Sequence, residues 1–170
     1  SFIALKHVEH CPSVILFNNQ KFHKMFNDKN IDIIVWVTRS HPEAIRSPEM
    51  FGWVQESNNK INKVSVKKPF GNPRKDPILI GTFTFKKAKY FLKSVEHCIA
   101  NGKKINGEYY VDDVINYSIK LGMKVALFPV NYFVCWGTPD ELETYKYWES
   151  CFERWGEHPY KKKINNQKKF

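Results

Sequence analysis

The 170 residues of this sequence suffice for one domain with a buried core, and a hydrophobic share of 42% with 15% aromatics excludes a wholly disordered chain. The net charge of +10 favours the binding of anions. No apolar run approaches the roughly 18 residues of a membrane helix, so no membrane association is predicted. Four widely spaced cysteines without a CxxC pair, and an N-terminus without a signal-peptide pattern, favour free thiols and a cytoplasmic protein.

The first thirty residues predict a strand followed by a helix. Val14–Phe17 is apolar and has the length of a short buried strand. Asn18 or Asn19 can cap a helix that runs to about Asn27, because a short amide side chain can accept from the free N–H groups of a first turn. The apolar face of this helix is predicted to carry Phe22, Met25 and Phe26.

A strand and a hairpin are predicted next. Asp32–Arg39 is rich in β-branched and aromatic residues, and its nearly continuous apolar run indicates burial on both faces of a sheet. Ser40–Glu49 contains two prolines and is predicted to be a loop. Phe51–Glu56 and Lys60–Val66 alternate apolar with polar residues around Asn58-Asn59, which predicts a β-hairpin.

The second half of the chain alternates strands with helices. After a Pro/Gly-rich loop over Pro69–Pro77, the predicted elements are a strand over Ile78–Phe85, a helix over Lys86–Ala100 ended by Asn101-Gly102, a helix from a cap at Asp112 or Asp113 to Gly122, a strand over Lys124–Val130, an extended segment over Tyr132–Trp136, and a helix begun by Thr138 and Pro139. Strands that alternate with helices indicate an α/β domain, and the hairpin makes its sheet mixed.

Five short segments are informative because of the order in which they occur. They are Phe51-Gly52-Trp53-Val54, Lys67-Lys68-Pro69, Gly81-Thr82-Phe83, Gly107-Glu108-Tyr109-Tyr110 and Gly137-Thr138. Each by itself is an ordinary turn, strand end or helix start. Together they resemble the sugar-1-phosphate nucleotidyltransferases, in which "YG.V", "V.EKP", "GIY" or "GTF", "GE.Y.TD" and "GT" follow one another. The match covers roughly Asp32 to Trp148 and is most similar to the capsule and surface-polysaccharide branch.

The resemblance implies a fold and a division of the chain. The expected fold is a Rossmann-like, GT-A-type mixed sheet flanked by helices and truncated on its N-terminal side, so that only the C-terminal, sugar-binding portion of the family is represented. Residues 1–155 would form this partial α/β domain. Residues 156–170, which hold five lysines and no acid in their last ten positions, would form a disordered basic tail.

The resemblance also implies a sugar-phosphate site. Gly52 would let the backbone approach the sugar ring, and Gly81 would lie on the strand beneath it. Lys68 matches the family lysine that contacts the sugar phosphate and is the candidate catalytic residue. Glu108 matches a carboxylate that accepts hydrogen bonds from sugar hydroxyls. The implied substrates are a sugar 1-phosphate and a nucleoside triphosphate, which react to a nucleotide sugar and pyrophosphate.

The sequence departs from the family where the family holds nucleotide and metal. The glycine-rich "G.GTR…PK" phosphate loop has no counterpart. Mg²⁺ is the cofactor expected for the family, but Asn18-Asn19 and Cys135 stand where its carboxylate ligands are expected, so no ligand is identified. A missing N-terminal half or a separate subunit would supply these parts, and activity of this chain alone is left open.

Two other functions remain as alternatives. The first is a non-catalytic, sugar-phosphate-binding or regulatory module derived from the family. The second is nucleic-acid binding through the basic tail and the lysines between Lys60 and Lys75, which rests on charge alone and is not favoured. A zinc site at His7, His10 and Cys11 lacks a second ligand pair at metal spacing. Because family members often assemble, a homo-oligomer is compatible with the resemblance.

Overall fold

The structure is a computed structural model, and it describes the backbone of residues 3–6, 13–136 and 139–155. The chain divides into two compact units. The first comprises residues 1–8 and 14–133, and the second comprises residues 9–13 and 134–170. The predicted basic tail, the cap at Thr138 and the His7, His10 and Cys11 group lie outside the described residues. No helix in the described ranges has the length and hydropathy needed to cross a membrane.

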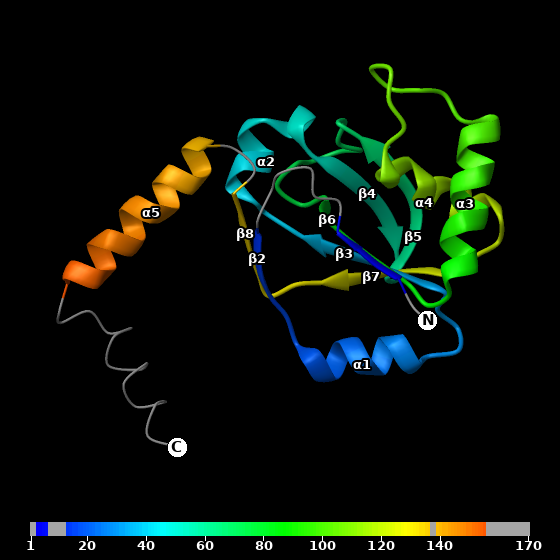
Figure 1. Cartoon of the computed structure of the whole chain (residues 1–170), viewed down its shortest axis with the longest axis horizontal. Helices are drawn as coiled ribbons and strands as arrows, with labels where there is room; N and C mark the ends of the chain where they lie inside the picture. The colour runs from blue at the N-terminus through cyan, green and yellow to red at the C-terminus, as the bar shows by residue number, and fades with distance from the viewer. Residues whose placement is uncertain (1–2, 7–12, 137–138, 156–170) are drawn as a thin grey trace. The chain divides into compact units, whose positions relative to one another are not determined.

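The first unit is built on a six-stranded mixed sheet with helices on both sides (Figure 1). The strands follow the order β1-β6-β3-β7-β5-β4. Its elements are β1 (Ile3–Lys6), α1 (Asn19–Asn27), β3 (Ile33–Thr38), α2 (Pro42–Arg46), η1 (Pro48–Met50), β4 (Gly52–Ser57), β5 (Lys60–Val66), β6 (Ile78–Phe85), α3 (Ala88–Asn101), α4 (Val111–Lys120) and β7 (Val125–Pro129). These bounds confirm the predicted mixed α/β class.

Strand β3 lies at the centre and is buried on both faces, as its apolar run predicts. It pairs with β7 in parallel and with β6 in antiparallel orientation. Because successive side chains alternate between faces, Ile33, Val35 and Val37 join the core cluster beneath α3 and α4, whereas Ile34 and Trp36 join the cluster beneath α1. One short sequence therefore supplies both cores.

Helix α1 covers one face of the sheet with aromatic side chains. Asn18 caps it by accepting from the backbone N–H of Lys21 at 2.9 Å, which confirms the predicted start. Phe22 lies 5.1 Å from Trp36 and 5.8 Å from Phe128, ring centre to ring centre. Burial of such large rings, with edge contacts, stabilises this side of the sheet.

The β4–β5 hairpin folds back over the sheet. Its turn residues Asn58 and Asn59 have φ of 52° and 61°, the left-handed conformation that asparagine tolerates and a two-residue hairpin requires. Strand β4 pairs with β6 through Trp53 and Ile78, while β5 pairs with β7 through Lys60 and Ala126. The strand pairings thus run in a closed circuit from β6 through β3, β7, β5 and β4 back to β6.

Two sequence-based boundaries are wrong. Ser40–Glu49 is not a loop but contains α2 and η1, because Pro42 and Pro48 each occupy a first helical turn, where the missing N–H costs nothing. Helix α4 has Tyr110 as its N-cap, so Asp112 and Asp113 are not caps. They lie in its first turn, where carboxylates favour the positive end of the helix dipole.

The remaining elements belong partly to the second unit. β2 (Ser13–Leu16) and β8 (Tyr132–Cys135) form a separate two-stranded sheet, as their predicted extended character allows. α5 (Pro139–Arg154) is the last described helix, and its first turn carries Asp140 and Glu141 as predicted. Cys98 and Cys151 are free thiols. Burial and the nearby Asp113 raise the pKa of the Cys98 thiol, which keeps it protonated and unreactive.

A buried hydrogen bond between β3 and β6 gives a prediction for stability. The Trp36 Nε1–H donates to Thr84 Oγ1 at 3.0 Å, and Thr84 is 1% exposed. We expect Thr84→Val to lower the free energy of unfolding by about 1–3 kcal/mol, because the indole N–H is left without an acceptor. Urea denaturation measures this loss.

The control for this prediction lies two residues away on the same strand. Thr82 Oγ1 is buried without a hydrogen-bond partner among the described residues, so Thr82→Val is expected to remove no hydrogen bond. Thr82→Val is expected to be neutral or stabilising. An equal loss in both variants would contradict the importance of the Trp36 hydrogen bond.

Candidate functional site

The candidate site is centred on Gly52 at the carboxyl end of β3. Thr38, the last residue of β3, and Trp53 both pair with Ile78, from opposite sides of β6. Gly52 precedes Trp53 and pairs with Val66 at the end of β5. The start of β4 and the end of β5 therefore meet beside the carboxyl end of β3, the part of an open α/β sheet where ligands usually bind.

Gly52 is required by a close approach from α4. A Cβ at this position would meet Asp112 Oδ2 closer than real side chains approach one another, and Leu79 Cδ1 at 2.8 Å. The missing side chain lets the half-buried Asp112 carboxylate lie directly against the β4 backbone. The sequence suggested a close approach at Gly52, but it assigned Asp112 only as a helix cap, because nothing in the spacing links residues sixty positions apart.

The lysine pair follows β5 and is bonded to the residue before Gly52. Lys67 has φ of 60° and donates its backbone N–H to Phe51 O at 3.1 Å, which turns the chain sharply after β5. Its Nζ lies 5.5 Å from the centre of the Tyr110 ring, at the start of α4. Lys68 follows and is exposed to solvent. Lys68 thus follows a turn whose backbone is bonded to Phe51, just before β4, and whose Lys67 side chain reaches the start of α4.

Gly81 lies within β6, two residues beyond Leu79. Its φ is 70°, a conformation available to glycine at no steric cost. The register between β3 and β6 shifts here, because Val35 pairs with Phe83 but Val37 pairs with Leu79. Gly81 therefore forms the centre of a β-bulge opposite Trp36 of β3.

Glu108 is the predicted residue least tied to the others. It lies on an exposed turn in which Ile105 and Glu108 exchange backbone hydrogen bonds of 2.9 and 3.0 Å around Asn106 and Gly107. Its carboxylate makes no ion pair with any residue that the structure describes. The structure brings together Gly52, the Lys67-Lys68 turn and Asp112. Glu108 lies four residues before Asp112, on a turn that precedes α4.

The residues at the expected metal positions do not fit Mg²⁺. Asn18 uses its amide oxygen to cap α1, and Cys135 offers a thiol, whereas Mg²⁺ favours carboxylate oxygens. Within the described ranges, no three histidines, cysteines or acids lie close enough to hold a metal ion.

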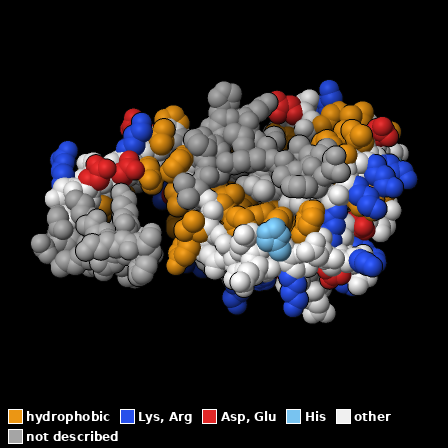
Figure 2. All heavy atoms as spheres, turned by 60° about the horizontal axis from the view of Figure 1, so that its bottom comes forward, with side chains coloured by type: hydrophobic (Ala, Val, Ile, Leu, Met, Phe, Trp, Pro, Cys, Tyr) orange, Lys and Arg blue, Asp and Glu red, His pale blue; other side chains and the backbone are white. Residues whose placement is uncertain are grey.

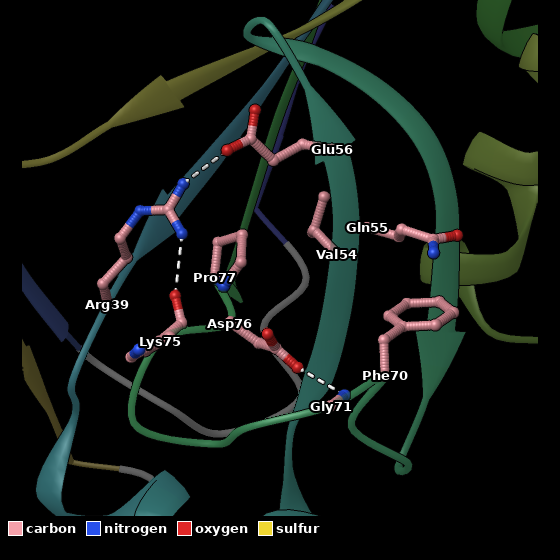
Figure 3. Close-up of a pocket in the computed structure, with 9 residues that line it drawn as sticks. All are labelled: Arg39, Val54, Gln55, Glu56, Phe70, Gly71, Lys75, Asp76 and Pro77. Carbon is pink, nitrogen blue, oxygen red and sulfur yellow. Dashed lines mark hydrogen bonds and ion pairs between the residues drawn. The ribbon is translucent and has the colours of Figure 1, made fainter.

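A polar pocket of about 320 Å³ lies near the site but contains none of the predicted residues (Figure 3). Arg39 spans it, donating to Glu56 at 2.9 Å and to the carbonyl of Lys75 at 2.8 Å. Asp76 accepts from the Gly71 backbone N–H at 2.7 Å. These charged side chains hold the Pro69–Pro77 loop against β3 and β4. The polar groups of the pocket therefore serve to fix the loop.

Solved structures of nucleotide-sugar enzymes share this fold. The nucleoside-diphosphate-sugar pyrophosphorylase from Vibrio cholerae RC9 aligns over 81% of this chain and 57% of its own, with a TM-score of 0.57 and 16% identity. A Bacillus anthracis protein solved with sucrose, and assigned as a glucose-1-phosphate thymidylyltransferase, aligns over 78% of this chain and 49% of its own, with a TM-score of 0.56 and 18% identity. The inositol-1-phosphate CTP transferase from T. maritima aligns over 79% and 50%, with a TM-score of 0.51 and 17% identity.

These similarities define the fold of the chain. It is a mixed α/β fold, with flanking helices, of the kind found in sugar-nucleotide pyrophosphorylases and nucleotidyltransferases. The chain spans about half the length of these solved structures. No protein-family model and no curated protein sequence matches it.

Proposed function

We propose that the chain binds a sugar 1-phosphate and forms the sugar-binding portion of a sugar-1-phosphate nucleotidyltransferase of the GT-A type, in the capsule and surface-polysaccharide branch. The observation that carries this proposal is the meeting of Gly52, Asp112 and the Lys67-Lys68 turn at the carboxyl end of β3. A carboxylate can accept hydrogen bonds from the sugar hydroxyls, and a lysine ammonium can bind the phosphate. The glycine lets the carboxylate lie close to the β4 backbone.

Each group has a role in this proposal. Gly52 leaves room for the Asp112 carboxylate against the β4 backbone, and the sugar ring is proposed to lie against that carboxylate. The carboxylates of Asp112 and Glu108 accept hydrogen bonds from sugar hydroxyls. Lys68 binds the phosphate as a flexible point charge, which lets a phosphate oxygen keep its freedom to react.

The complete reaction joins the sugar phosphate to a nucleotide. An oxygen of the sugar 1-phosphate forms a bond to the α-phosphorus of a nucleoside triphosphate, the bond to the β-phosphate oxygen breaks, and pyrophosphate leaves. In this proposal the phosphate loop and Mg²⁺ ligands come from a part of the enzyme other than the described residues, and the protein acts in the cytoplasm, alone or as a homo-oligomer. The groups of this chain bind and orient the attacking phosphate.

The test is a titration of glucose 1-phosphate and related sugar 1-phosphates against the chain and its Lys68→Ala variant. We expect at least about tenfold weaker binding in the variant, because a hydrogen bond to a charged group contributes roughly 1.5–3 kcal/mol. Lys63→Ala is the matched control, since Lys63 is an exposed lysine on β5 that lies away from the turn. Equal affinity of the wild type and Lys68→Ala, or no binding by the wild type, would overturn the proposed site.

A second measurement separates the enzyme from a binding module. Because the phosphate loop and Mg²⁺ ligands are proposed to lie outside the described residues, release of pyrophosphate is followed with the complete enzyme that contains this chain, in the presence of a bound sugar 1-phosphate, each nucleoside triphosphate and Mg²⁺. If pyrophosphate is released and the Lys68→Ala variant releases it more slowly, the result supports nucleotidyl transfer. Binding without release identifies a sugar-phosphate-binding module derived from this fold.

A further inference from the structure

A cleft of about 820 Å³ lies on the α1 side of the first unit and contains none of the sugar-phosphate residues. Its walls are α1 and the tip of the β4–β5 hairpin, and β7 lies between them. Figure 2 brings this side of the molecule forward and shows Lys and Arg side chains gathered on the right-hand part of the face, with few acidic ones among them. The volume lies in the range of 300–1,000 Å³ that is usual for small-molecule sites.

The cleft exists because β7 pairs with β5 at one position only and because α1 ends before the hairpin tip. β7 pairs with β3 along its whole length, but with β5 only through Ala126 and Lys60. α1 ends at Asn27 and does not reach the hairpin tip. The apolar side chains of Met25, Ile31 and Met123 are consequently only half-buried along the cleft. An apolar lining open to water favours an occupant with an apolar body.

The charge of the cleft is strongly positive. Four lysines line it, two from α1, one from the hairpin and one preceding β7: Lys21, Lys24, Lys60 and Lys124. The single lining carboxylate, Asp28, accepts the backbone N–H of Asn30 at 2.8 Å. Within the described part of the chain, Lys124 is the one lysine of the four whose ammonium forms a hydrogen bond, to Asn30 Oδ1 at 3.3 Å, and none of the four forms an ion pair there. Ammonium groups on facing walls fit an anion held between them.

The hairpin tip adds hydrogen-bonding groups. Asn58, Asn59 and Asn62 line the cleft together with Asn30. Asn59 is held in place because its carbonyl accepts the backbone N–H of Leu127 at 3.0 Å. An amide side chain both donates and accepts, so it can read the polar edge of a planar group.

We propose that this cleft binds a small molecule that carries two or more phosphate groups on a planar or apolar body, of the class of a nucleoside diphosphate. The phosphates lie between the lysines of α1 and Lys60, the apolar body lies against Met25 and Met123, and the asparagines contact its polar edge. The site is separate from the sugar-phosphate site, because Gly52 and the hairpin tip are at opposite ends of β4. The six residues of β4 span roughly 17 Å.

The experiment titrates the full chain with UDP and with inorganic pyrophosphate by calorimetry. The variant Lys24→Ala/Lys60→Ala removes one ammonium from each wall, and Lys63→Ala/Lys93→Ala removes the same charge from exposed positions outside the cleft. UDP is expected to bind at least about tenfold more weakly to the first variant and equally to the second. Pyrophosphate, which lacks the apolar body, is expected to bind the wild type at least about tenfold more weakly than UDP.

Three outcomes overturn the proposal. Equal losses in the two double variants indicate general attraction to a basic surface, and pyrophosphate affinity equal to that of UDP excludes the apolar contact. Loss of UDP binding in Lys68→Ala places the nucleotide in the sugar-phosphate site instead. Amide NMR shifts on UDP binding are expected at Asn58–Asn62 and Met123–Leu127, and shifts confined to residues near Gly52 contradict the proposal.

Discussion

Gly52→Ala is expected to abolish the binding of sugar 1-phosphates while lowering the free energy of unfolding by only about 1 kcal/mol. The new methyl group occupies the space of Asp112 Oδ2 and lies 2.8 Å from Leu79 Cδ1. Both atoms end flexible side chains, so they can rotate away without moving the backbone. The displaced carboxylate no longer lies against β4, where it is proposed to accept hydrogen bonds from the sugar hydroxyls.

The control for Gly52→Ala is a glycine with room for a side chain. A Cβ at Gly71 meets only the Asp76 carboxylate, at 3.7 Å or more, which is ordinary contact. Gly71→Ala is expected to change neither binding nor stability. Calorimetric titration with the sugar phosphate and urea denaturation measure the two effects. Wild-type affinity in Gly52→Ala would exclude this backbone from the binding site.

Asn116→Ala is expected to lower the free energy of unfolding by about 2–4 kcal/mol. The Asn116 side chain accepts from the Val64 N–H and donates to the Val64 C=O, both at 2.8 Å, in the manner of a neighbouring strand. It thereby satisfies the edge of β5 where pairing with β7 has ended. Its removal leaves two partly buried backbone groups without partners, at about 1–3 kcal/mol each before water compensates.

The same variant is expected to weaken sugar-phosphate binding. Asn116 lies one turn after Asp112 on α4, so loosening α4 from β5 shifts the carboxylate that lies against Gly52. Asn62→Ala is the control, because the Asn62 amide donates to the exposed Ser57 Oγ at 2.9 Å and loses a contact that water replaces. A cost below about 1 kcal/mol in Asn116→Ala would show that α4 is held by its apolar face alone.

Local chemistry explains why much of the fold could be predicted. The apolar run of β3, the Asn58-Asn59 turn and the Asn18 cap each depend on residues within a few positions of one another. α2 and η1 were missed because Pro42 and Pro48 end one conformation and begin another, and proline content alone does not distinguish the two.

The candidate site likewise has residues that the sequence predicted and contacts that it did not. The order of short motifs singled out Gly52, Lys68, Gly81 and Glu108, and the structure brings Gly52 and the Lys68 turn to the carboxyl end of β3, whereas Gly81 lies opposite Trp36 within that strand. Asp112 and Tyr110 were not predicted as partners of Gly52 and Lys67. Their contacts depend on where α4 packs, which is decided by Ile115 in the core and by the Asn116 hydrogen bonds.

The sequence by itself determined the alternation of strands and helices, the basic charge and the glycines that permit close backbone approach. These are properties of neighbouring residues and of composition. Only the tertiary structure decided that the hairpin closes a circuit of strands, that Asp112 fills the space left by Gly52, and that Lys21, Lys24 and Lys60 face one cleft. Such contacts join segments tens of residues apart, and they follow from the shared burial of apolar faces rather than from any local pattern.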